Sequence, residues 1–401
     1  MATKSSGATD VAKHERPYDI VLFGATGFAG ELTARYLASH APQELRWALA
    51  GRNAGKLAAV RQSLADLDPA LVDLPLLPAD AEDASTLIAV AQSARVVITT
   101  VGPYVLYGDA LVAACASAGT DYVDLTGEPE FVDNTYVRHH ATAVHTGARI
   151  VHACGFDSVP HDLGAYFTVQ QLPIDTPLRL SGYVKVSAAF SGGTFHSAVT
   201  AMTRPRQNVA AARARRASEP AAVRSARYVV GKPHRDPVNS GCALPMPTVD
   251  GHVVARSARA IARYGPDFQY SHFLSVAHLH NAAATVTGLG GVALLAQVPP
   301  TRRLLLARLA PGTGPSPQRR ARSWFRVSFV GEGGGQRVVT RVSGGDPGYD
   351  ETAKMLAESA LCLAFDELPA TAGQVTTATA MGTALLDRLQ AAGLVFEVIK
   401  A

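Results

Sequence analysis

Short apolar runs alternate with amphipathic stretches along the first part of the chain, and each run ends in glycine or polar residues. Such runs are typical of strands buried on both faces of a parallel sheet, and the stretches between them have the spacing of helices. The runs predict strands at 20–23, 45–52, 72–80, 95–104, 120–128 and 149–155. These successive β-α units predict one complete doubly wound α/β domain, which we assign to residues 17–165.

Beyond residue 175 the pattern changes to the looser alternation of antiparallel strands. Residues 327–330 and 336–342 predict two such strands, joined through a glycine-rich turn. We therefore expect a second, smaller α+β domain over 166–345 that serves substrate binding or dimerisation, with a homodimer as one expected state. Amphipathic helices in the C-terminal part, 346–401, predict that it packs back near the first domain.

Two segments bear on where the protein is found. Residues 1–16 are small and polar and lack the apolar core of a signal peptide, so we expect a disordered lead-in and a cytoplasmic protein. Residues 281–300 carry no charge, and two arginines follow closely. Their length approaches that of a membrane span, but their glycines and the final Pro-Pro favour a buried or membrane-touching helix pair. A membrane-touching helix pair would place the protein peripherally at the inner face of the membrane.

Composition narrows the class of protein. The 401 residues suffice for two domains with separate cores, and 47% hydrophobic with 17% charged residues suit a globular α/β enzyme. A net charge of +4 is too weak to indicate nucleic-acid binding, and the two basic stretches, 204–235 and 302–326, lack interleaved aromatic residues. The 4 cysteines are scattered without a CxxC motif, as is typical of reduced thiols in the cytosol.

The strongest candidate site follows the first strand. Gly24, Gly27 and Gly30 come directly after an apolar run and before a helix, which is the context of a dinucleotide-binding turn. The first glycine permits the tight turn, the second lets the backbone approach a pyrophosphate, and the third allows helix and strand to pack closely. The turn is completed by the residues between them: Ala25, Thr26 and Phe28. The helix N-terminus that follows favours an anion; the alternative is a purely structural glycine turn.

The end of the second strand bears on the choice of cofactor. Arg52 occupies the place where NAD-binding proteins usually have an acidic residue for the ribose. Lys56 follows one turn on, and a guanidinium can pair with a 2′-phosphate, so we expect NADP(H) rather than NAD(H). Alternatively, Arg52 is a solvated residue at the start of a helix. Asp80, at the carboxyl end of the third strand, either edges the adenine or caps the helix that follows.

The fourth strand runs into a Gly-Pro turn. We expect this turn, Gly102 and Pro103, beneath the ribose and nicotinamide of the cofactor. Tyr104 and Tyr107 come next, and each can donate a proton or polarise a carbonyl in catalysis. The alternative for each tyrosine is packing under the nicotinamide.

Further polar candidates follow the fifth and sixth strands. Asp157 and Ser158 lie at the carboxyl end of the sixth strand and are either site residues or helix caps. Glu128 either holds a ribose or substrate hydroxyl or makes a loop hydrogen bond, and Cys154 is expected to be a buried thiol. A histidine pair at 278 and 280 shares one strand face without an evident third ligand, so we expect no metal.

Several segments that carry these features also carry a family resemblance. They are Phe23–Gly30, Leu49–Arg52, Thr100–Tyr104 with Tyr107 and Gly108, Asp121–Glu128, His152–Pro160, Phe190–Thr194 and Gly345–Tyr349. Together they resemble the saccharopine dehydrogenase-like oxidoreductases, and within them the trans-acting enoyl reductases of mycobacterial polyketide-lipid biosynthesis. The resemblance implies a Rossmann fold, a doubly wound parallel sheet, with a second, smaller α+β domain.

The activity implied by this resemblance is NADPH-dependent reduction of an enoyl thioester. The thioester is held on a polyketide synthase or acyl carrier that lacks its own working enoyl reductase. The reaction needs a hydride at Cβ, charge stabilisation at the thioester oxygen and a proton for Cα. Carrier proteins are typically acidic, so the two basic stretches either steer and orient them or are solvated loops.

Two other functions stay open. One is an oxidoreductase of the same family that acts on a free small molecule. The other is a lipid- or membrane-associated protein that binds NADP(H) through the glycine turn without turnover.

Overall fold

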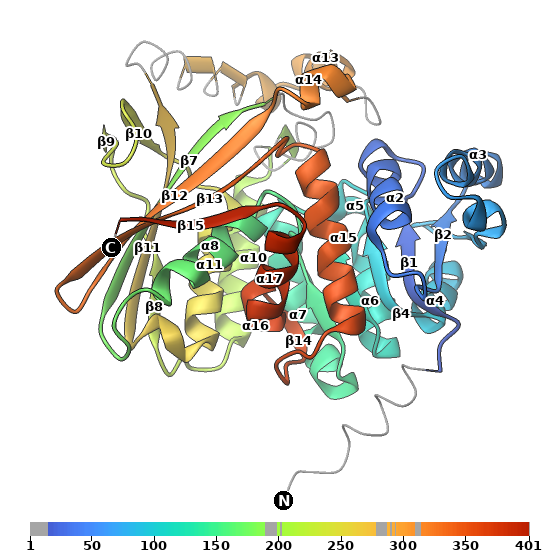
Figure 1. Cartoon of the computed structure of the whole chain (residues 1–401), viewed down its shortest axis with the longest axis horizontal. Coiled ribbons are helices and arrows are strands. Elements are labelled where there is room, and N and C mark those ends of the chain that lie inside the picture. Colours follow the sequence, from blue (N-terminus) through green and yellow to red (C-terminus); the bar gives the residue numbers. More distant parts are fainter. Residues whose placement is uncertain are drawn as a thin grey trace, which may run out of the picture. The chain divides into compact units, whose positions relative to one another are not determined.

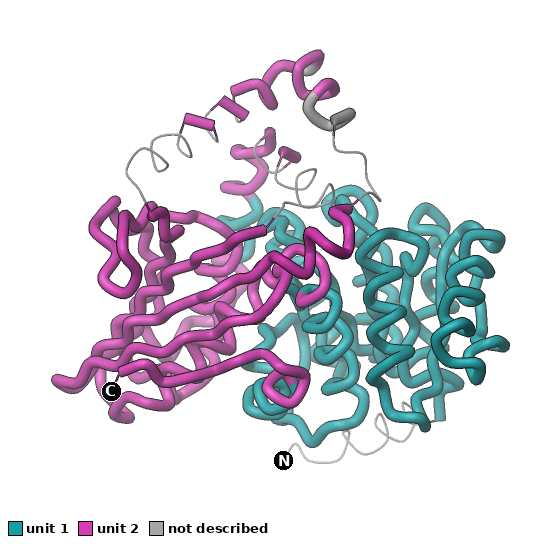
Figure 2. The backbone as a smooth tube through the Cα atoms, turned by 45° about the horizontal axis from the view of Figure 1, so that its top comes forward, with its two compact units in different colours: residues 1–155, 211–215, 352–388 teal, residues 156–210, 216–351, 389–401 magenta. Residues whose placement is uncertain are grey.

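The computed structural model describes residues 15–188, 203–277 and 314–400 without a gap, with shorter pieces at 199–200, 287–288, 291–292 and 294–308. The chain divides into two compact units (Figure 2). Unit 1 comprises residues 1–155, 211–215 and 352–388, and unit 2 comprises 156–210, 216–351 and 389–401.

Unit 1 is built on a seven-stranded sheet in which all neighbouring strands are parallel (Figure 1). Its strands are, in spatial order, β14 Gly373–Val375, β6 Arg149–Val151, β5 Asp121–Asp124, β4 Ala94–Thr99, β1 Tyr18–Phe23, β2 Trp47–Gly51 and β3 Leu76–Pro78. β1 lies between β2 and β4, and its Ile20, Val21 and Leu22 are fully buried. Both faces of β1 are covered, which explains why its sequence is apolar at successive positions.

Helices cover the sheet of unit 1. They are α2 Phe28–His40, α3 Ala54–Ala65, η1 Pro69–Asp73, α4 Ala84–Ser93, α5 Tyr104–Tyr107, α6 Asp109–Ala118, α7 Pro129–Thr146, α15 Asp350–Phe365, α16 Thr377–Ala380 and α17 Gly382–Ala391. Val21 and Val97 of the sheet share one core with Leu87 of α4, Leu111 of α6 and Phe131 of α7. This core holds the carboxyl ends of the central strands in fixed positions.

The C-terminal part contributes a strand that the sequence pattern did not predict. β14 pairs with β6 in parallel, from Gly373 opposite Arg149 to Val375 opposite Val151. The hydroxyl of Tyr36 in α2 donates to the Glu358 carboxylate of α15 at 2.8 Å. Residues 352–388 therefore complete the sheet and the helical layers of unit 1.

Unit 2 is built on an eight-stranded mixed sheet. Its strands are β7 Leu178–Ser187, β8 Ser225–Tyr228, β9 His234–Arg235, β10 Cys242–Pro245, β11 Asp267–Val276, β12 Trp324–Gly333, β13 Gln336–Gly344 and β15 Val395–Lys400. Its helices are α8 Val159–Val169, α10 Pro205–Ser218 except for residues 211–215, which belong to unit 1, α11 Val249–Ala260, η2 Ala262–Tyr264, α13 Pro299–Arg308 and α14 Pro317–Arg320. β11 pairs in parallel with β7 and β8, and the other pairs are antiparallel. α8 packs closely on this sheet, since a Cβ at Gly164 would lie 2.3 Å from the Phe329 ring.

The predicted fold class, a Rossmann-type parallel sheet with a second α+β part, is confirmed, and β12 and β13 form the predicted antiparallel pair. Two details differ from the expected boundaries. Unit 2 begins at residue 156 and includes α8, which we had assigned to the first domain over 17–165. Within the expected strand at 72–80, only the short β3, Leu76–Pro78, is a strand. Residues 72–73 instead end η1, because the Asp68 carboxylate accepts from the Ala70 N–H at 3.0 Å and starts a helical turn at Pro69.

Some expectations concern residues outside the described ranges. They include the motif at 190–194, the histidine pair at 278 and 280, and residues 281–286, 289–290 and 293 of the uncharged segment 281–300. Within the part of the chain that the structure describes, no helix is long and apolar enough to cross a membrane.

Candidate functional site

The glycine turn after β1 is held by hydrogen bonds with β2 and with the residue that follows β4, and by one bond within the turn. The Gly24 N–H donates to the Ala50 carbonyl of β2 at 3.0 Å, and the Thr100 hydroxyl beyond β4 donates to the Gly24 carbonyl at 3.0 Å. The Gly27 N–H closes the turn on the same carbonyl, also at 3.0 Å. Gly24 has φ +91°, a conformation that L side chains rarely adopt, and a Cβ there would lie 2.7 Å from Val101.

Gly30 lets helix α2 approach this turn. A Cβ at Gly30 would lie 2.2 Å from the Gly24 carbonyl oxygen, so no other residue fits without moving the helix. Gly27 is the N-cap of α2 and makes no side-chain capping bond. The first N–H groups of a helix have no intrahelical acceptor, and together with the helix dipole they favour an anion. Ala25 is buried in this turn and Thr26 is exposed. The uncapped start of α2 beside the glycine turn fits a bound pyrophosphate.

The carboxyl end of β2 presents two cations to solvent. Arg52 and Lys56 are exposed, and Arg52 forms no ion pair with any residue that the structure describes. Asn53 caps α3 by accepting from the Lys56 N–H at 2.9 Å. Asp80 accepts from the Glu82 N–H at 3.1 Å, whereas the cap of α4 is Asp83. Asp80 is thus not the N-cap of α4, which was one of its two alternatives. The other alternative, that Asp80 edges the adenine of the cofactor, stays a prediction.

The Gly-Pro turn after β4 contains a cis peptide bond between Gly102 and Pro103. Glu128 fixes the next two residues: its buried carboxylate accepts from the Tyr104 and Val105 N–H groups at 3.1 and 2.8 Å. This is the loop hydrogen bond that was one of the two alternatives for Glu128. The turn is therefore held by an anion at the start of α5, and the exposed Gly102 lies at its tip.

The two tyrosines of this region have different environments. Tyr104 is buried, and its hydroxyl donates to the Thr99 carbonyl at 3.2 Å and accepts from the Leu125 N–H at 3.2 Å. Burial raises the pKa of Tyr104 well above its ordinary value, and the nearby Asp124 raises it further. These partners favour a packing role for Tyr104. Tyr107 is 38% exposed, so its hydroxyl is the more accessible of the two.

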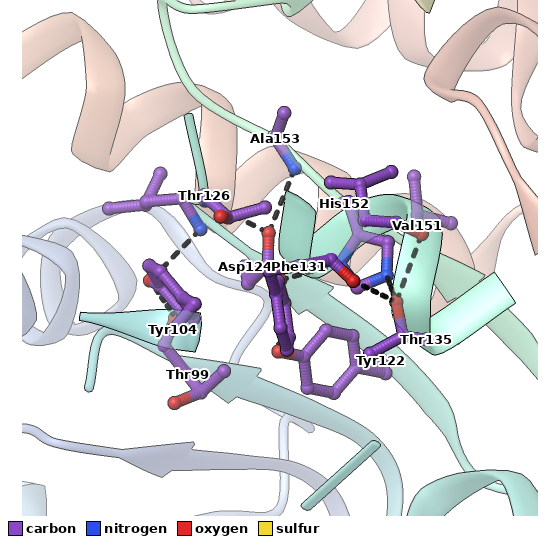
Figure 3. A network of polar contacts seen from close by, with 12 residues as sticks. Thr99, Tyr104, Tyr122, Asp124, Thr126, Phe131, Thr135, Val151, His152 and Ala153 are labelled. Atoms are coloured by element: carbon purple, nitrogen blue, oxygen red, sulfur yellow. Dashed lines mark hydrogen bonds and ion pairs between the residues drawn. The ribbon is translucent and has the colours of Figure 1, made fainter. Parts of the chain in front are cut away.

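A buried network joins the carboxyl ends of β4, β5 and β6 (Figure 3). One oxygen of Asp124 accepts from the Tyr122 hydroxyl at 2.9 Å and lies 2.7 Å from His152 Nδ1. The other oxygen accepts from the N–H groups of Thr126 and Ala153 at 3.0 and 2.8 Å. Four hydrogen bonds thus converge on one fully buried carboxylate.

This network shapes the end of β6. Ala153 has φ +60°, unusual for a residue with a side chain, and the Asp124 carboxylate and carbonyl hold Ala153 and Cys154 in place. His152 Nε2 lies 3.2 Å from the Thr135 hydroxyl in α7. Cys154 is buried, as expected. We had not singled out the pairing of His152 with Asp124; each ends a predicted strand, and adjacent strand ends could have indicated it.

Asp157 and Ser158 belong to unit 2, whereas the two tyrosines belong to unit 1. Ser158 is the N-cap residue of α8, but its hydroxyl makes no capping bond and is buried without a partner among the described residues. Ser158 therefore occupies the cap position without the side-chain capping bond that was one of its two alternatives. Asp157 is partly exposed, and desolvation raises its pKa to about 6. Across the described parts of the chain, no cluster of three or more His, Cys, Asp or Glu side chains could hold a metal.

Comparison with known proteins bears on this site. A profile of the saccharopine dehydrogenase NADP binding domain matches residues 20–151, from β1 to β6. A Mycobacterium leprae protein named trans-acting enoyl reductase is 38% identical over 416 residues, which cover 95% of this chain and 97% of that protein. The chain belongs to the saccharopine dehydrogenase-like family.

Other relatives extend this likeness. A Mycobacterium tuberculosis protein, also named trans-acting enoyl reductase, is 38% identical over 95% of this chain and 97% of its own length. A second protein of that organism, given the same name provisionally, is 40% identical over 94% and 97% of the two chains. Apo saccharopine dehydrogenase from Saccharomyces cerevisiae shares the fold, with a TM-score of 0.57 at 11% identity over 95% of this chain and 100% of that chain. For this family member, the matched NADP-binding domain implies a nicotinamide dinucleotide cofactor.

Proposed function

We propose that this protein is an NADPH-dependent enoyl reductase that acts in trans on enoyl thioesters. The observation that carries the proposal is the glycine turn, where Gly24 and Gly30 bring the uncapped start of α2 against the end of β1. Such a start binds the pyrophosphate of a dinucleotide. The proposed substrate is an enoyl chain on a polyketide synthase or acyl carrier in complex lipid biosynthesis.

Residues around the turn would divide the work of binding. The N–H groups at the start of α2 hold the pyrophosphate, and Arg52 with Lys56 pairs with the 2′-phosphate that distinguishes NADPH from NADH. Gly102 and Pro103, which precede the two residues that Glu128 binds, would lie beneath the nicotinamide ribose. When bound, NADPH supplies the hydride. The buried Asp124 network would hold the neighbouring strand ends in place.

The substrate class is supported by the relatives. Proteins named trans-acting enoyl reductase match this chain over nearly their whole length, so both units have counterparts in them. The exposed Tyr107 is our candidate for polarising the thioester carbonyl, and Tyr104 packs beneath the turn.

Turnover on a carrier-bound substrate tests the proposal. The purified chain is mixed with NADPH and an enoyl thioester on an acyl carrier protein, and the acyl mass is measured with the loss of nicotinamide absorbance. With NADPH deuterated at C4, we expect each acyl chain to gain one deuterium from the cofactor and one hydrogen from the solvent. Gly27→Asp is the matched variant, because its carboxylate would meet the pyrophosphate; we expect no turnover from it.

Either of two results would contradict the proposal. One is reduction of a free small molecule with no activity on any thioester. The other is stable partition to lipid vesicles with NADPH bound and no turnover.

A further inference from the structure

A short segment of unit 2 exposes several large apolar side chains to solvent. Leu294, Leu295, Val298 and Leu304 are 74%, 46%, 51% and 60% exposed. The first two lie in a helical turn, Val298 follows it, and Leu304 belongs to helix α13 (Figure 1). Apolar side chains that are exposed singly are common on protein surfaces, whereas neighbouring ones mark a contact surface. We call residues 294–304 the apolar segment.

Hydrogen bonds join the helical turn to α13. The Val298 carbonyl accepts from the Arg302 N–H at 2.9 Å and from the Thr301 hydroxyl at 2.9 Å. The Val298 N–H donates to the Leu295 carbonyl at 3.4 Å. Ala296, between the exposed leucines and Val298, is fully buried. The apolar segment is therefore hydrogen-bonded helical backbone, whose small alanine faces the protein while its large side chains face solvent.

Cations accompany these apolar side chains. Arg303 is exposed and Arg302 is partly exposed, and neither forms an ion pair with a residue that the structure describes. The sequence carries no charge from 281 to 301, and it then has 7 arginines without an acidic residue from 302 to 326. The apolar segment thus presents exposed leucines beside positive charge that no described carboxylate neutralises.

This combination distinguishes between the possible partners. An acidic carrier protein offers charge complementarity to the arginines, but its charged surface does not suit the leucines. A second copy of this chain that packed leucines against leucines would bring its own arginines close to these, and like charges repel. A bilayer with anionic lipids suits both features, because the acyl chains take up the leucines and the headgroups pair with the arginines.

The dimensions of α13 fit a contact in the plane of a membrane surface. The helix has 10 residues, so it is about 15 Å long, whereas the hydrocarbon core of a bilayer is about 30 Å thick. Pro299 and Pro300 at its start cannot donate the N–H groups that a continuous helix through the preceding turn would need. The two helical pieces therefore form a short, interrupted helix, which suits the boundary between headgroups and acyl chains.

We propose that the apolar segment docks this protein on the surface of a membrane that contains anionic lipids. Leu294, Leu295 and Leu304 enter the boundary between headgroups and acyl chains. Arg302 and Arg303 pair with the lipid phosphates. Such binding grows with the buried apolar area and with the attraction to anionic lipid, so both kinds of side chain contribute. This docking is a further activity of unit 2, and it does not depend on the reaction proposed above.

Flotation of the purified full chain with lipid vesicles tests the proposal. Vesicles of mixed phosphatidylcholine and phosphatidylglycerol are compared with vesicles of phosphatidylcholine alone. We expect the chain to float with the anionic vesicles and to bind the neutral ones at least about 5-fold more weakly. Raising the salt from about 0.1 to about 0.5 M should weaken binding to the anionic vesicles, because it screens the exposed charges.

Two double variants separate the two contributions. Leu294→Ser with Leu304→Ser removes the two most exposed leucines of the segment and should reduce binding to anionic vesicles at least about 10-fold. Arg302→Glu with Arg303→Glu should bind anionic vesicles no better than neutral ones. Both variants should keep the wild-type thermal midpoint, because only surface side chains are changed.

The matched apolar control is Ile174→Ser with Val223→Ser. These residues are 66% and 95% exposed and belong to the same unit, outside the apolar segment. We expect this control to bind anionic vesicles as the wild type does. The matched charge control is Arg337→Glu with Lys400→Glu, on β13 and β15, which should lose far less binding than the arginine variant of the segment.

Tryptophan fluorescence reports insertion itself. Leu304→Trp places an indole in the apolar segment. We expect its emission to shift to shorter wavelength when anionic vesicles are added, because the indole leaves water. Val223→Trp is the control and should show no shift beyond that of the wild type, which has 2 tryptophans of its own.

Failure of the wild type to float with anionic vesicles would overturn the proposal, and so would unchanged binding by Leu294→Ser with Leu304→Ser. It would also be overturned by a wild type that binds no vesicles and forms dimers that dissociate in this leucine variant, because a second copy of the chain would then cover the segment. Turnover on thioesters is measured without vesicles, so failure of the proposed function would leave the outcome of the flotation test unchanged.

Discussion

At the scale of single residues, the proposed cofactor site depends on two glycines that face each other. Gly24 adopts φ +91°, and Gly30 leaves only enough room for a hydrogen where it meets the Gly24 carbonyl. Both requirements follow from the close approach of α2 to β1, and the pattern of three glycines after an apolar run predicts them. The residue types in this turn are therefore enough to predict its backbone geometry.

Gly30→Ala tests this close approach. The added Cβ would lie 2.2 Å from a backbone oxygen, so α2 must move away from the turn. We expect NADPH affinity to fall at least about 10-fold and the free energy of unfolding to fall by about 1–3 kcal/mol, as for overpacking. Gly27→Ala is the control for stability, because its Cβ would meet the same oxygen at an ordinary 3.4 Å. An equal loss of the free energy of unfolding in both variants, measured by urea unfolding, would mean that the Gly30 contact is not what matters.

Arg52 decides between the two nicotinamide cofactors. A guanidinium that pairs with the 2′-phosphate contributes about 1.5–3 kcal/mol, so Arg52→Ala should reduce the preference for NADPH over NADH by about 10 to 100-fold. The Kd values of both nucleotides measure this. Arg35→Ala, in α2, removes a cation without touching the end of β2, and its preference should match the wild type. An unchanged preference for NADPH over NADH in Arg52→Ala would contradict the pairing of Arg52 with the 2′-phosphate and would favour NAD(H) as the cofactor.

Some residue roles could not be read from the sequence. Ser158 stands at an N-cap position, yet its hydroxyl does not cap α8, because a residue type that favours capping caps only when its rotamer also reaches the free N–H groups. Tyr104 follows a strand as a catalytic tyrosine would, but its hydroxyl bonds to the Thr99 carbonyl. The contact of His161 with Asp250 joins two distant helices, and only the tertiary fold brings them together.

At the scale of elements, the parallel sheet of unit 1 was predictable and its edge was not. Each of β1 to β6 lies within one of the predicted strand ranges or overlaps it, and β1, β2, β4 and β5 are largely buried. β14 has only three residues and lies far along the chain, so no local pattern identifies it as a partner of β6. The same limit applies to β15, which joins the sheet of unit 2.

The start of the central strand depends on one ion cluster. The buried Asp19 of β1 accepts from the Arg46 side chain at 2.8 Å and from Arg95 of β4 at 3.2 Å. Desolvation tends to raise the pKa of Asp19, but the hydrogen bonds from Arg46 and Arg95 outweigh it and lower the pKa overall. This carboxylate therefore stabilises the fold above the pKa of an unfolded aspartate, and the contribution is lost as the pH falls through the folded value.

Asp19→Asn should show this dependence. We expect its urea midpoint to lie well below that of the wild type near pH 7, and the gap to narrow as the pH is lowered towards about 3. Asp66→Asn is the control, since Asp66 is exposed at the end of α3 and should give the wild-type profile. A gap between Asp19→Asn and the wild type that stays constant with pH would show that the carboxylate charge is not what stabilises the strand start.

At the scale of the whole molecule, the proposed function requires a surface that meets an acidic carrier. Helix α10 is a candidate, because Arg206 and Arg213 are exposed on it and it contains no acidic residue. The same helix is anchored through Arg215, which is buried, stacks over the Tyr136 ring at 4.0 Å and lies 3.5 Å from Asp133. An anchored helix with an exposed basic face is suited to orient a charged partner.

The double substitution Arg206→Glu with Arg213→Glu tests this surface. We expect kcat/KM to fall about 10-fold or more for an enoyl chain on an acyl carrier protein and to stay unchanged for the pantetheine thioester. Raising the salt to about 0.5 M should erase the wild-type advantage of the carrier substrate, because exposed charges are then screened. Arg337→Glu with Lys400→Glu makes the same change in net charge on β13 and β15. If this control loses as much activity, net charge and not α10 steers the carrier.

The most direct test of the central claim is a calorimetric titration of the purified full chain with NADPH and, separately, with NADH. The account predicts one site per chain that binds NADPH with micromolar or better affinity and binds NADH at least about 10-fold more weakly. Absence of NADPH binding would contradict the assignment of the glycine turn, and with it the reductase that we propose.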